Sequence, residues 1–173
     1  MTSHYEKNLD RVDANTQALS PVNFLPHTAA IYPDNIAIIH GLDKTSYRQL
    51  LQRCKRLASA FEKRGIAQGS TVSIVAPNIP AHLEAHFAVP MTRAVLNSIN
   101  VRLDAKTIAY IFDHGESDIV LVDGQFADVV KQAVALSQTK PTIVDIDDVL
   151  GPQNVRVGEL CYEDLILEGD EEF

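Results

Sequence analysis

Three polar side chains that directly follow predicted strands are the best candidates for ligand binding in this sequence. Asn78 follows a strand predicted at 72–76, and Asn100 and Arg102 follow a strand predicted at 95–99. Ligands of open α/β sheets bind outside the carboxyl ends of the strands, so these side chains are well placed to line a crevice. The guanidinium of Arg102 presents a fixed fork of donors, which suits a phosphate group.

Two of these candidates also have a purely structural interpretation, which the sequence leaves open. The side chain of Asn78 can cap the helix that is expected to follow it. Arg102 can donate to carbonyl groups at the strand end or to the carboxylate of Asp104 instead of a ligand. The interpretations differ in consequence, because only a binding residue would affect one ligand selectively.

Other reactive side chains have a spacing that favours packing over catalysis or metal binding. His82 and His86 are four residues apart and share one helix face, but Glu84 points elsewhere and no third ligand is evident. The sequence contains no Walker-type loop and no dinucleotide fingerprint. Its one pair of loop glycines, Gly65 and Gly69, leads from a helix into a strand, whereas phosphate loops lead into a helix. We therefore expect no catalytic and no metal-binding residue in this chain.

Hydrophobic periodicity predicts alternating strands and helices that would position the candidate residues. The clearest helix begins with a capping box at 46–49 and ends at Gly65. A strand at 36–40 and a turn at 41–44 precede it, after a short helix with Asn23 at its N-cap. The other predicted elements are helices at 80–87, 104–112, 126–136 and 162–167 and strands at 119–122 and 142–146. This alternation is typical of an α/β fold, a mostly parallel sheet with helices on both faces.

Composition divides the chain into three parts. Residues 1–19 lack periodicity and are expected to form an N-terminal arm, whereas residues 20–150 carry the α/β pattern. Residues 151–173 are rich in Asp and Glu and are interpreted as an acidic tail or linker. The basic residues of the helix at 46–64 are interpreted as a solvated face.

Charge and hydropathy exclude two classes of partner. The chain has 15 basic and 23 acidic residues and a net charge of −8, so phosphate backbones would repel it and nucleic-acid binding is not expected. No apolar stretch reaches the ~18 residues of a membrane span, and no secretory signal pattern is evident. The two cysteines do not indicate a disulfide framework, so a cytoplasmic location is expected.

The order of several short motifs resembles the N-terminal region of the acyl-CoA synthetases, which are adenylate-forming, AMP-binding ligases. The motifs lie between Leu19 and Ile146, and the likeness is greatest to the bacterial medium-chain and plant acyl-activating branch. They include Val75-Ala76-Pro77-Asn78-Ile79-Pro80, Glu84-Ala85-His86-Phe87, Asn97-Ser98-Ile99-Asn100-Val101-Arg102-Leu103 and Asp113-His114-Gly115-Glu116. Arg93 departs from the family pattern, which usually has Gly there, and Pro26 stands where many members have a helix former.

The resemblance implies a parent enzyme that joins a fatty or other carboxylic acid to coenzyme A, using ATP and Mg²⁺. The family's nucleotide-binding loop and C-terminal lysine do not occur in this sequence, so we expect an N-terminal part that is inactive alone. In some members the arginine matching Arg102 lies near the nucleotide phosphate of coenzyme A. The implied partners are the acid, coenzyme A, the remainder of the enzyme and, in a homodimer, a second copy.

An alternative from another functional class is a stand-alone, non-catalytic α/β binding or oligomerisation module derived from such an enzyme. The sequence does not indicate the length of the acyl group. If the chain is part of a larger enzyme, one face of its parallel sheet should be left apolar and uncovered.

Overall fold

A five-stranded parallel sheet and a separate two-stranded hairpin organise the fold. The computed structural model describes residues 20–173, so the arm expected at 1–19 lies outside the described residues. The main sheet has the order β4-β3-β5-β6-β7, and β1 pairs with β2 in the antiparallel hairpin. The strands are β1 (Ile36–His40), β2 (Asp43–Ser46), β3 (Thr71–Val75), β4 (Val95–Ser98), β5 (Ser117–Asp123), β6 (Thr142–Ile146) and β7 (Leu160–Cys161). The predicted α/β fold with a parallel sheet is confirmed.

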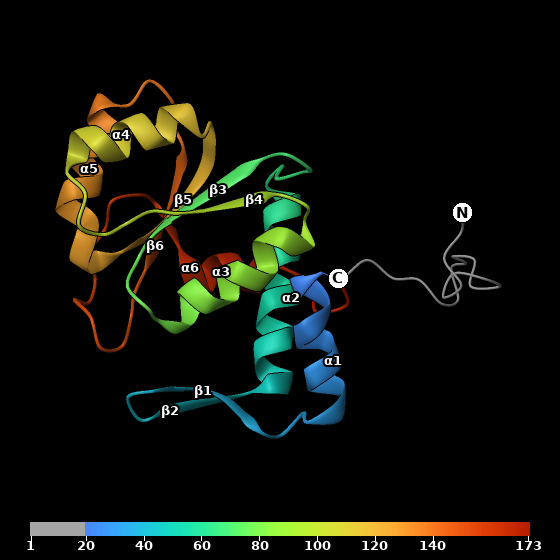
Figure 1. The fold of residues 1–173 in the computed structure, drawn as a ribbon. Coiled ribbons are helices and arrows are strands. Elements are labelled where there is room, and N and C mark those ends of the chain that lie inside the picture. Colours follow the sequence, from blue (N-terminus) through green and yellow to red (C-terminus); the bar gives the residue numbers. More distant parts are fainter. Residues whose placement is uncertain (1–19) are drawn as a thin grey trace, which may run out of the picture.

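Helices cover both faces of the sheet (Figure 1). They are α1 (Phe24–Ile31), α2 (Tyr47–Lys63), α3 (Pro80–Met91), α4 (Ala105–His114), α5 (Ala127–Leu136) and α6 (Tyr162–Glu168), with short 3₁₀ turns at Pro21–Asn23 and Gly124–Phe126. Helices α4 and α5 pack on one face, whereas α2, α3 and α6 pack on the other. The uncovered sheet face that we expected is therefore not found within residues 20–173.

The two sheet faces bury separate cores, and local signals set the helices that supply them. Leu57 and Phe61 of α2 pack against the first face, and Phe112 of α4 packs against the second. The predicted capping box of α2 is present: Ser46 Oγ accepts from the amide of Gln49 at 3.3 Å, and Gln49 Oε1 accepts from the amide of Ser46 at 2.8 Å. This reciprocal cap fixes where α2 begins.

The hairpin formed by β1 and β2 differs from the sequence interpretation. Residues 41–44 were expected to form only a turn, but Asp43 and Lys44 already pair with His40 and Ile39. The turn itself is tight because Gly41 has a φ of +62°, a conformation that glycine adopts readily. The hairpin projects away from the main sheet and lies below α3 in Figure 1.

Arg93 adopts a left-handed backbone conformation. This conformation accounts for the Gly that the acyl-CoA synthetases usually have at this position. Its φ is +62°, and it follows the last turn of α3. That turn contains Pro90, so α3 continues past the end predicted at residue 87. The amide of Arg93 donates to the carbonyl of Pro90, and its own carbonyl accepts from Gly69. The turn is thus preserved, although a left-handed conformation costs a residue with a Cβ about 1–2 kcal/mol.

Part of the segment interpreted as an acidic tail or linker is built into the fold. Strand β7 extends the sheet by pairing with β6, and Leu165 and Ile166 of α6 are buried. The high density of acidic residues favoured the interpretation as a tail, although the apolar positions recur on one side of the helix. Whether residue 150 separates two parts of the protein stays a prediction.

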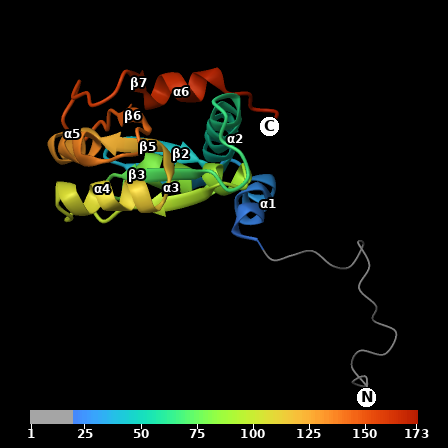
Figure 2. The same ribbon diagram turned by 90° about the horizontal axis from the view of Figure 1, so that it is seen from above.

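The basic face of α2 is partly exposed and forms ion pairs with this acidic segment. Figure 2 shows α6 and the chain end beside α2. The ion pairs are Arg53–Glu163, Arg56–Glu171 and Arg64–Glu168. Gly169 lies so close to the carbonyl of Arg56 that a Cβ at this position would collide with it. The sequence interpretation did not include this pairing, because it considered each charged run alone.

Candidate functional site

The three candidate binding residues lie at the edge of the main sheet that is formed by the carboxyl ends of its strands. Strands β3 and β4 are parallel neighbours, so their carboxyl ends meet at the same edge. Asn78 follows the first of these ends, and Asn100 and Arg102 follow the second. All three residues are exposed. The predicted juxtaposition is present, and the binding role of these residues stays a prediction.

Neither structural alternative considered for these residues occurs in the part of the chain that is described. Helix α3 has Ile79 at its N-cap and no side-chain cap bond, so Asn78 is not a capping residue. Asp104 caps α4 through the amide of Thr107 at 2.8 Å, a bond that lowers the pKa of Asp104. The guanidinium of Arg102 makes no hydrogen bond or ion pair within residues 20–173, and Asn100 Oδ1 accepts from the backbone amide of Arg102 at 3.0 Å. This turn leaves the guanidinium available.

The two histidines of α3 make hydrogen bonds with neighbouring backbone and side-chain groups. His82 Nδ1 lies 3.0 Å from the carbonyl of Pro77, and His82 Nε2 lies 2.8 Å from Ser98 Oγ. His82 therefore connects the loop after β3 to the end of β4. His86 Nδ1 lies 2.8 Å from the carbonyl of His82. Within residues 20–173 no three His, Cys, Asp or Glu side chains form a group that could hold a metal ion.

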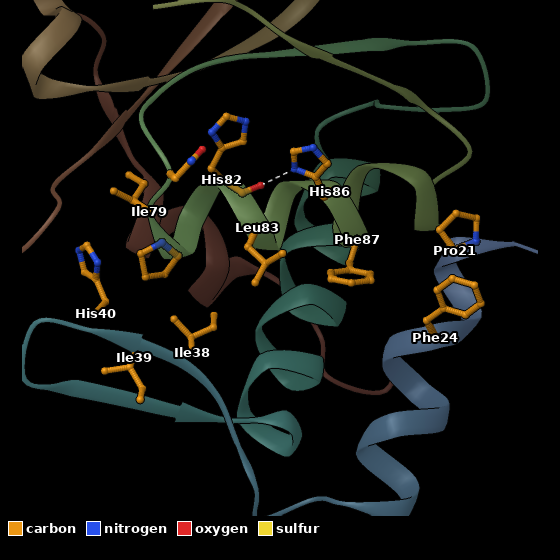
Figure 3. A pocket seen from close by; sticks show the side chains of 12 residues that line it. Pro21, Phe24, Ile38, Ile39, His40, Ile79, His82, Leu83, His86 and Phe87 are labelled. Atoms are coloured by element: carbon orange, nitrogen blue, oxygen red, sulfur yellow. Dashed lines mark hydrogen bonds between the residues drawn. The ribbon is translucent and has the colours of Figure 1, made fainter.

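An apolar groove, which we call the hairpin groove, lies between the hairpin, α3 and the start of α1 (Figure 3). Its volume is about 600 Å³, and Asn78 is the only candidate binding residue that lines it. It is lined by Pro21, Phe24, Ile38, Ile39, His40, Asn78, Ile79, Pro80, His82, Leu83, His86 and Phe87. The sequence analysis did not identify this groove, because its walls come from α1, β1 and α3, whose packing a local pattern does not contain.

The strand order moves the expected ligand crevice away from Arg102. The chain passes from β3 to β4 and then to β5 on the other side of β3, so the order of strands reverses between β3 and β5. Crevices of open α/β sheets form at such a reversal. Asn78 lies on the β3 side of this point and Asp123 ends β5. Arg102 follows the edge strand β4, beyond β3.

Asp123 is the most unusual ionisable group at this sheet edge. It is 1% exposed, its Oδ1 accepts from the amide of Gln125 at 2.9 Å, and its Oδ2 has no hydrogen-bond partner among the described residues. Burial raises the pKa of Asp123, the amide of Gln125 opposes this shift, and the nearby charge of Asp148 adds to it. Asp148 is itself 2.6 Å from His40 Nε2 and so ties the hairpin to the loop after β6.

We expect Asp123→Asn to stabilise the protein at pH 7, because the amide keeps an acceptor for Gln125 and removes a buried charge. The melting temperature should rise by about 2–4 °C, or about 1 kcal/mol for a domain of this size. A carboxyl group with a raised folded-state pKa lowers stability above that pKa and ceases to do so below its unfolded-state pKa. The difference between the variant and the wild type should therefore shrink as the pH falls toward about 4.

Asp113 provides a control of opposite sign. Its pKa is lowered to about 2, first by the hydroxyl of Ser137 and then by the amides of Thr139 and Gln138. A lowered folded-state pKa stabilises the protein above the unfolded-state pKa, and this stability is lost as the pH falls toward 2. Asp113→Asn should therefore lower the melting temperature at pH 7. An equal drop for Asp123→Asn and Asp113→Asn would contradict the account of Asp123.

A partly buried ionic network joins α2, α3 and α6. Glu84 of α3 is 1% exposed, and its Oε1 accepts from Arg53 Nε at 2.5 Å. Its Oε2 accepts from the hydroxyl of Tyr162 at 2.8 Å. Burial alone would lower the pKa of Arg53, but the hydrogen bonds that Arg53 donates to Glu163 and Glu84 raise it above its ordinary value. Burial also raises the pKa of Tyr162, so this hydroxyl stays a donor.

No helix within residues 20–173 combines the length and the apolar character that a bilayer crossing requires.

Comparison with known proteins gives a consistent match over nearly the whole chain. Residues 25–165 match the family model described as "AMP-binding enzyme". The chain is 39% identical over 175 residues to the acetate/butyrate–CoA ligase AAE7, peroxisomal, of Arabidopsis thaliana, covering 94% of this chain and 31% of that protein. It is 34% identical over 179 residues to the trans-cinnamate:CoA ligase, peroxisomal, of Petunia hybrida, covering 95% and 31%.

Solved structures show the same fold. The anthranilate CoA ligase AuaEII, in complex with anthranoyl-AMP, superposes with a TM-score of 0.80 at 17% identity, covering 94% of this chain and 30% of that chain. A benzoate CoA ligase from Burkholderia xenovorans LB400 gives 0.74 at 20% identity, covering 88% and 29%. The chain thus spans about a third of the length of the relatives that it matches. The resemblance inferred from its motifs is confirmed: the chain belongs to the AMP-binding enzyme family and matches the N-terminal part of its acyl-CoA ligases.

Proposed function

We propose that this chain is the N-terminal part of an ATP-dependent acyl-CoA ligase. In the first step a carboxylate would attack ATP to give an acyl adenylate and pyrophosphate. In the second step the thiol of coenzyme A would displace AMP and form the thioester. The observation that supports this most is the 39% identity to an acetate/butyrate–CoA ligase, which extends over 94% of the chain.

The described residues support a role in scaffolding and in coenzyme A binding. Arg102 offers an exposed guanidinium without a partner in residues 20–173, and Asn78 and Asn100 lie at the same sheet edge. The nucleotide-binding loop and the C-terminal lysine with which the family binds ATP do not occur in this sequence. We therefore assign the binding of ATP and Mg²⁺ to other parts of the ligase and derive no step for them here.

For the substrate we propose a carboxylic acid, and for the compartment the cytoplasm. The matched relatives are named for acetate, butyrate and trans-cinnamate, so their names do not favour one acyl length. Two of them are named as peroxisomal, and the cytoplasmic location expected from the sequence remains a proposal. That the ligase forms a homodimer is likewise a proposal.

The 173-residue chain alone should release no pyrophosphate and form no acyl-CoA, because its sequence lacks the nucleotide-binding loop and the catalytic lysine of the family. A chimera should be active, in which this chain replaces the matching N-terminal part of the Arabidopsis acetate/butyrate–CoA ligase. Both proteins are assayed for pyrophosphate with butyrate, ATP, Mg²⁺ and coenzyme A. Pyrophosphate above the protein-free blank from the isolated chain would contradict the first expectation.

A folded but inactive chimera would instead favour a non-catalytic module. Circular dichroism and a cooperative melting transition establish that the chimera is folded. The intact Arabidopsis ligase, prepared in parallel, shows that the assay detects turnover.

A further inference from the structure

We propose that His82 is a positioning residue for coenzyme A, because it ties the loop that carries Asn78 to the strand end that leads to Arg102. The proposal rests on the proposed function, since coenzyme A is a substrate of the ligase. His82 touches no substrate in this proposal. It acts through Arg102, whose guanidinium is proposed to bind a phosphate of coenzyme A.

Backbone bonding between β3 and β4 stops before the proposed binding residues. Ile74 and Ser98 are the last residues paired between the two strands, and the amide of Ile99 donates to the carbonyl of Ile74 at 3.0 Å. Beyond this bond, no backbone hydrogen bond joins residues 76–79 to residues 99–103 in the described chain. The relative position of these two loops therefore depends on side-chain contacts.

The side chain of His82 supplies such a contact. It extends from the first turn of α3 (Figure 3), with Nδ1 3.0 Å from the carbonyl of Pro77 and Nε2 2.8 Å from Ser98 Oγ. Pro77 directly precedes Asn78, and Ser98 is the last residue of β4. Because α3 has no side-chain bond at its N-cap, no cap orients the loop instead.

The partners of the His82 ring determine where its hydrogens lie. The carbonyl of Pro77 can only accept, so Nδ1 carries a hydrogen. In the neutral ring Nε2 then accepts from the hydroxyl of Ser98, and in the protonated ring Nε2 donates to the same oxygen. Both hydrogen bonds are compatible with either state of the ring, so the link does not require one protonation state.

A short path leads from this link to the proposed coenzyme A site. Ser98 is two residues before Asn100, whose Oδ1 accepts from the amide of Arg102 at 3.0 Å. The carbonyl of Asn100 also accepts from the amide of Leu103 at 3.2 Å, so the turn after β4 is held together. A misplacement of about 1 Å can cost an enzyme about 100-fold in rate. Because Ser98 is exposed and water can replace its bond, we expect a smaller effect here.

His82→Asn tests the proposal in the active chimera, because the Asn amide can still donate to Pro77 but does not reach Ser98. The KM for coenzyme A should rise about 3- to 10-fold, the loss expected from one hydrogen bond, and Ser98→Ala should raise it equally. Adenylation, followed by pyrophosphate exchange without coenzyme A, should change little. His82→Gln, whose longer amide reaches the position of Nε2, should restore most of the wild-type KM.

Coupling to Arg102 distinguishes positioning from an independent role. If His82 acts through Arg102, His82→Asn should raise the KM no further in a chimera that already carries Arg102→Ala. Full additivity of the two changes overturns the proposal, as does an unchanged KM in His82→Asn. Equal losses in adenylation and thioester formation, with a lower melting temperature, also overturn it, because they indicate a purely structural role. None of these results removes the ligase function, which turnover of the chimera establishes.

His114→Asn is the matched control for the loss of a histidine. His114 is the last residue of α4 and lies three residues before β5 begins, near the amino ends of the strands. It is therefore at the opposite edge of the sheet from Arg102. The KM for coenzyme A should be the same in His114→Asn and in the unmodified chimera.

A second measurement on the 173-residue chain applies if the chimera is inactive, a result that counts against the ligase function alone. Hydrogen exchange of the Arg102 and Leu103 amides, which bond to Asn100, is followed by NMR. Loosening of the turn in His82→Asn should speed exchange of both amides about 3- to 10-fold, and His114→Asn should change neither. Faster exchange supports the positioning role, whereas unchanged exchange in His82→Asn overturns it.

Discussion

Arg53→Met is expected to destabilise this protein by about 3–5 kcal/mol, because it leaves the carboxylate of Glu84 buried without a cation. Glu84 is 1% exposed, and Arg53 binds it through Nε at 2.5 Å and Nη2 at 3.2 Å. Methionine keeps much of the apolar stem of Arg53, so lost packing contributes little. For 173 residues the melting temperature should fall by roughly 6–20 °C, measured by calorimetry or circular dichroism.

Two further variants separate the buried pair from its neighbours. Adding Glu84→Gln to Arg53→Met should recover part of the lost stability, because the uncompensated charge is then removed. Arg48→Met is the matched control, since Arg48 and its partner Asp34 are 57% and 85% exposed and such pairs contribute about 0–1 kcal/mol. If Arg53→Met and Arg48→Met destabilise the protein equally, the buried network does not hold α2, α3 and α6 together.

The same network shows what the sequence could not predict. Periodicity placed α2, α3 and four of the five parallel strands within a few residues of their observed bounds, because burial of one face imposes a regular repeat, but it did not predict β7. Arg53 and Glu84 are 31 residues apart, and Tyr162 lies 78 residues beyond Glu84. Pairing over such separations is fixed by how helices pack, which a local pattern does not contain. The basic residues of α2 and the acidic residues of 151–173 are nevertheless opposite in charge. This complementarity is the signal in the sequence that could have predicted their pairing.

The candidate site was predicted only in part, for a related reason. The rule that ligands bind at strand carboxyl ends correctly placed Asn78, Asn100 and Arg102 at one edge. It could not find Asp123, because the position where strand order reverses becomes known only once the sheet order is known. It also missed the hairpin groove, since the groove depends on how β1 packs beside α3 and the start of α1.

The available guanidinium of Arg102 makes a selective loss of coenzyme A binding the expected result of Arg102→Ala in the active chimera. If Arg102 contacts a nucleotide phosphate, its removal deletes a charge-assisted hydrogen bond of about 1.5–3 kcal/mol. The KM for coenzyme A should then rise about 10- to 100-fold, because 1.4 kcal/mol corresponds to about a factor of ten. Adenylation, followed by pyrophosphate exchange without coenzyme A, should change little, because coenzyme A takes no part in it.

A structural role for Arg102 would have a different signature. It would lower the melting temperature and impair adenylation and thioester formation together, since both depend on the folded chain. The exposed side chain of Arg102, which lacks a partner in residues 20–173, argues against this outcome. Arg102→Lys keeps a charge but loses the planar fork, so its KM should lie between those of the wild type and Arg102→Ala. Equal losses in both half-reactions, or an unchanged KM for coenzyme A, would remove Arg102 from the coenzyme A site and leave the ligase function to be judged by turnover of the chimera.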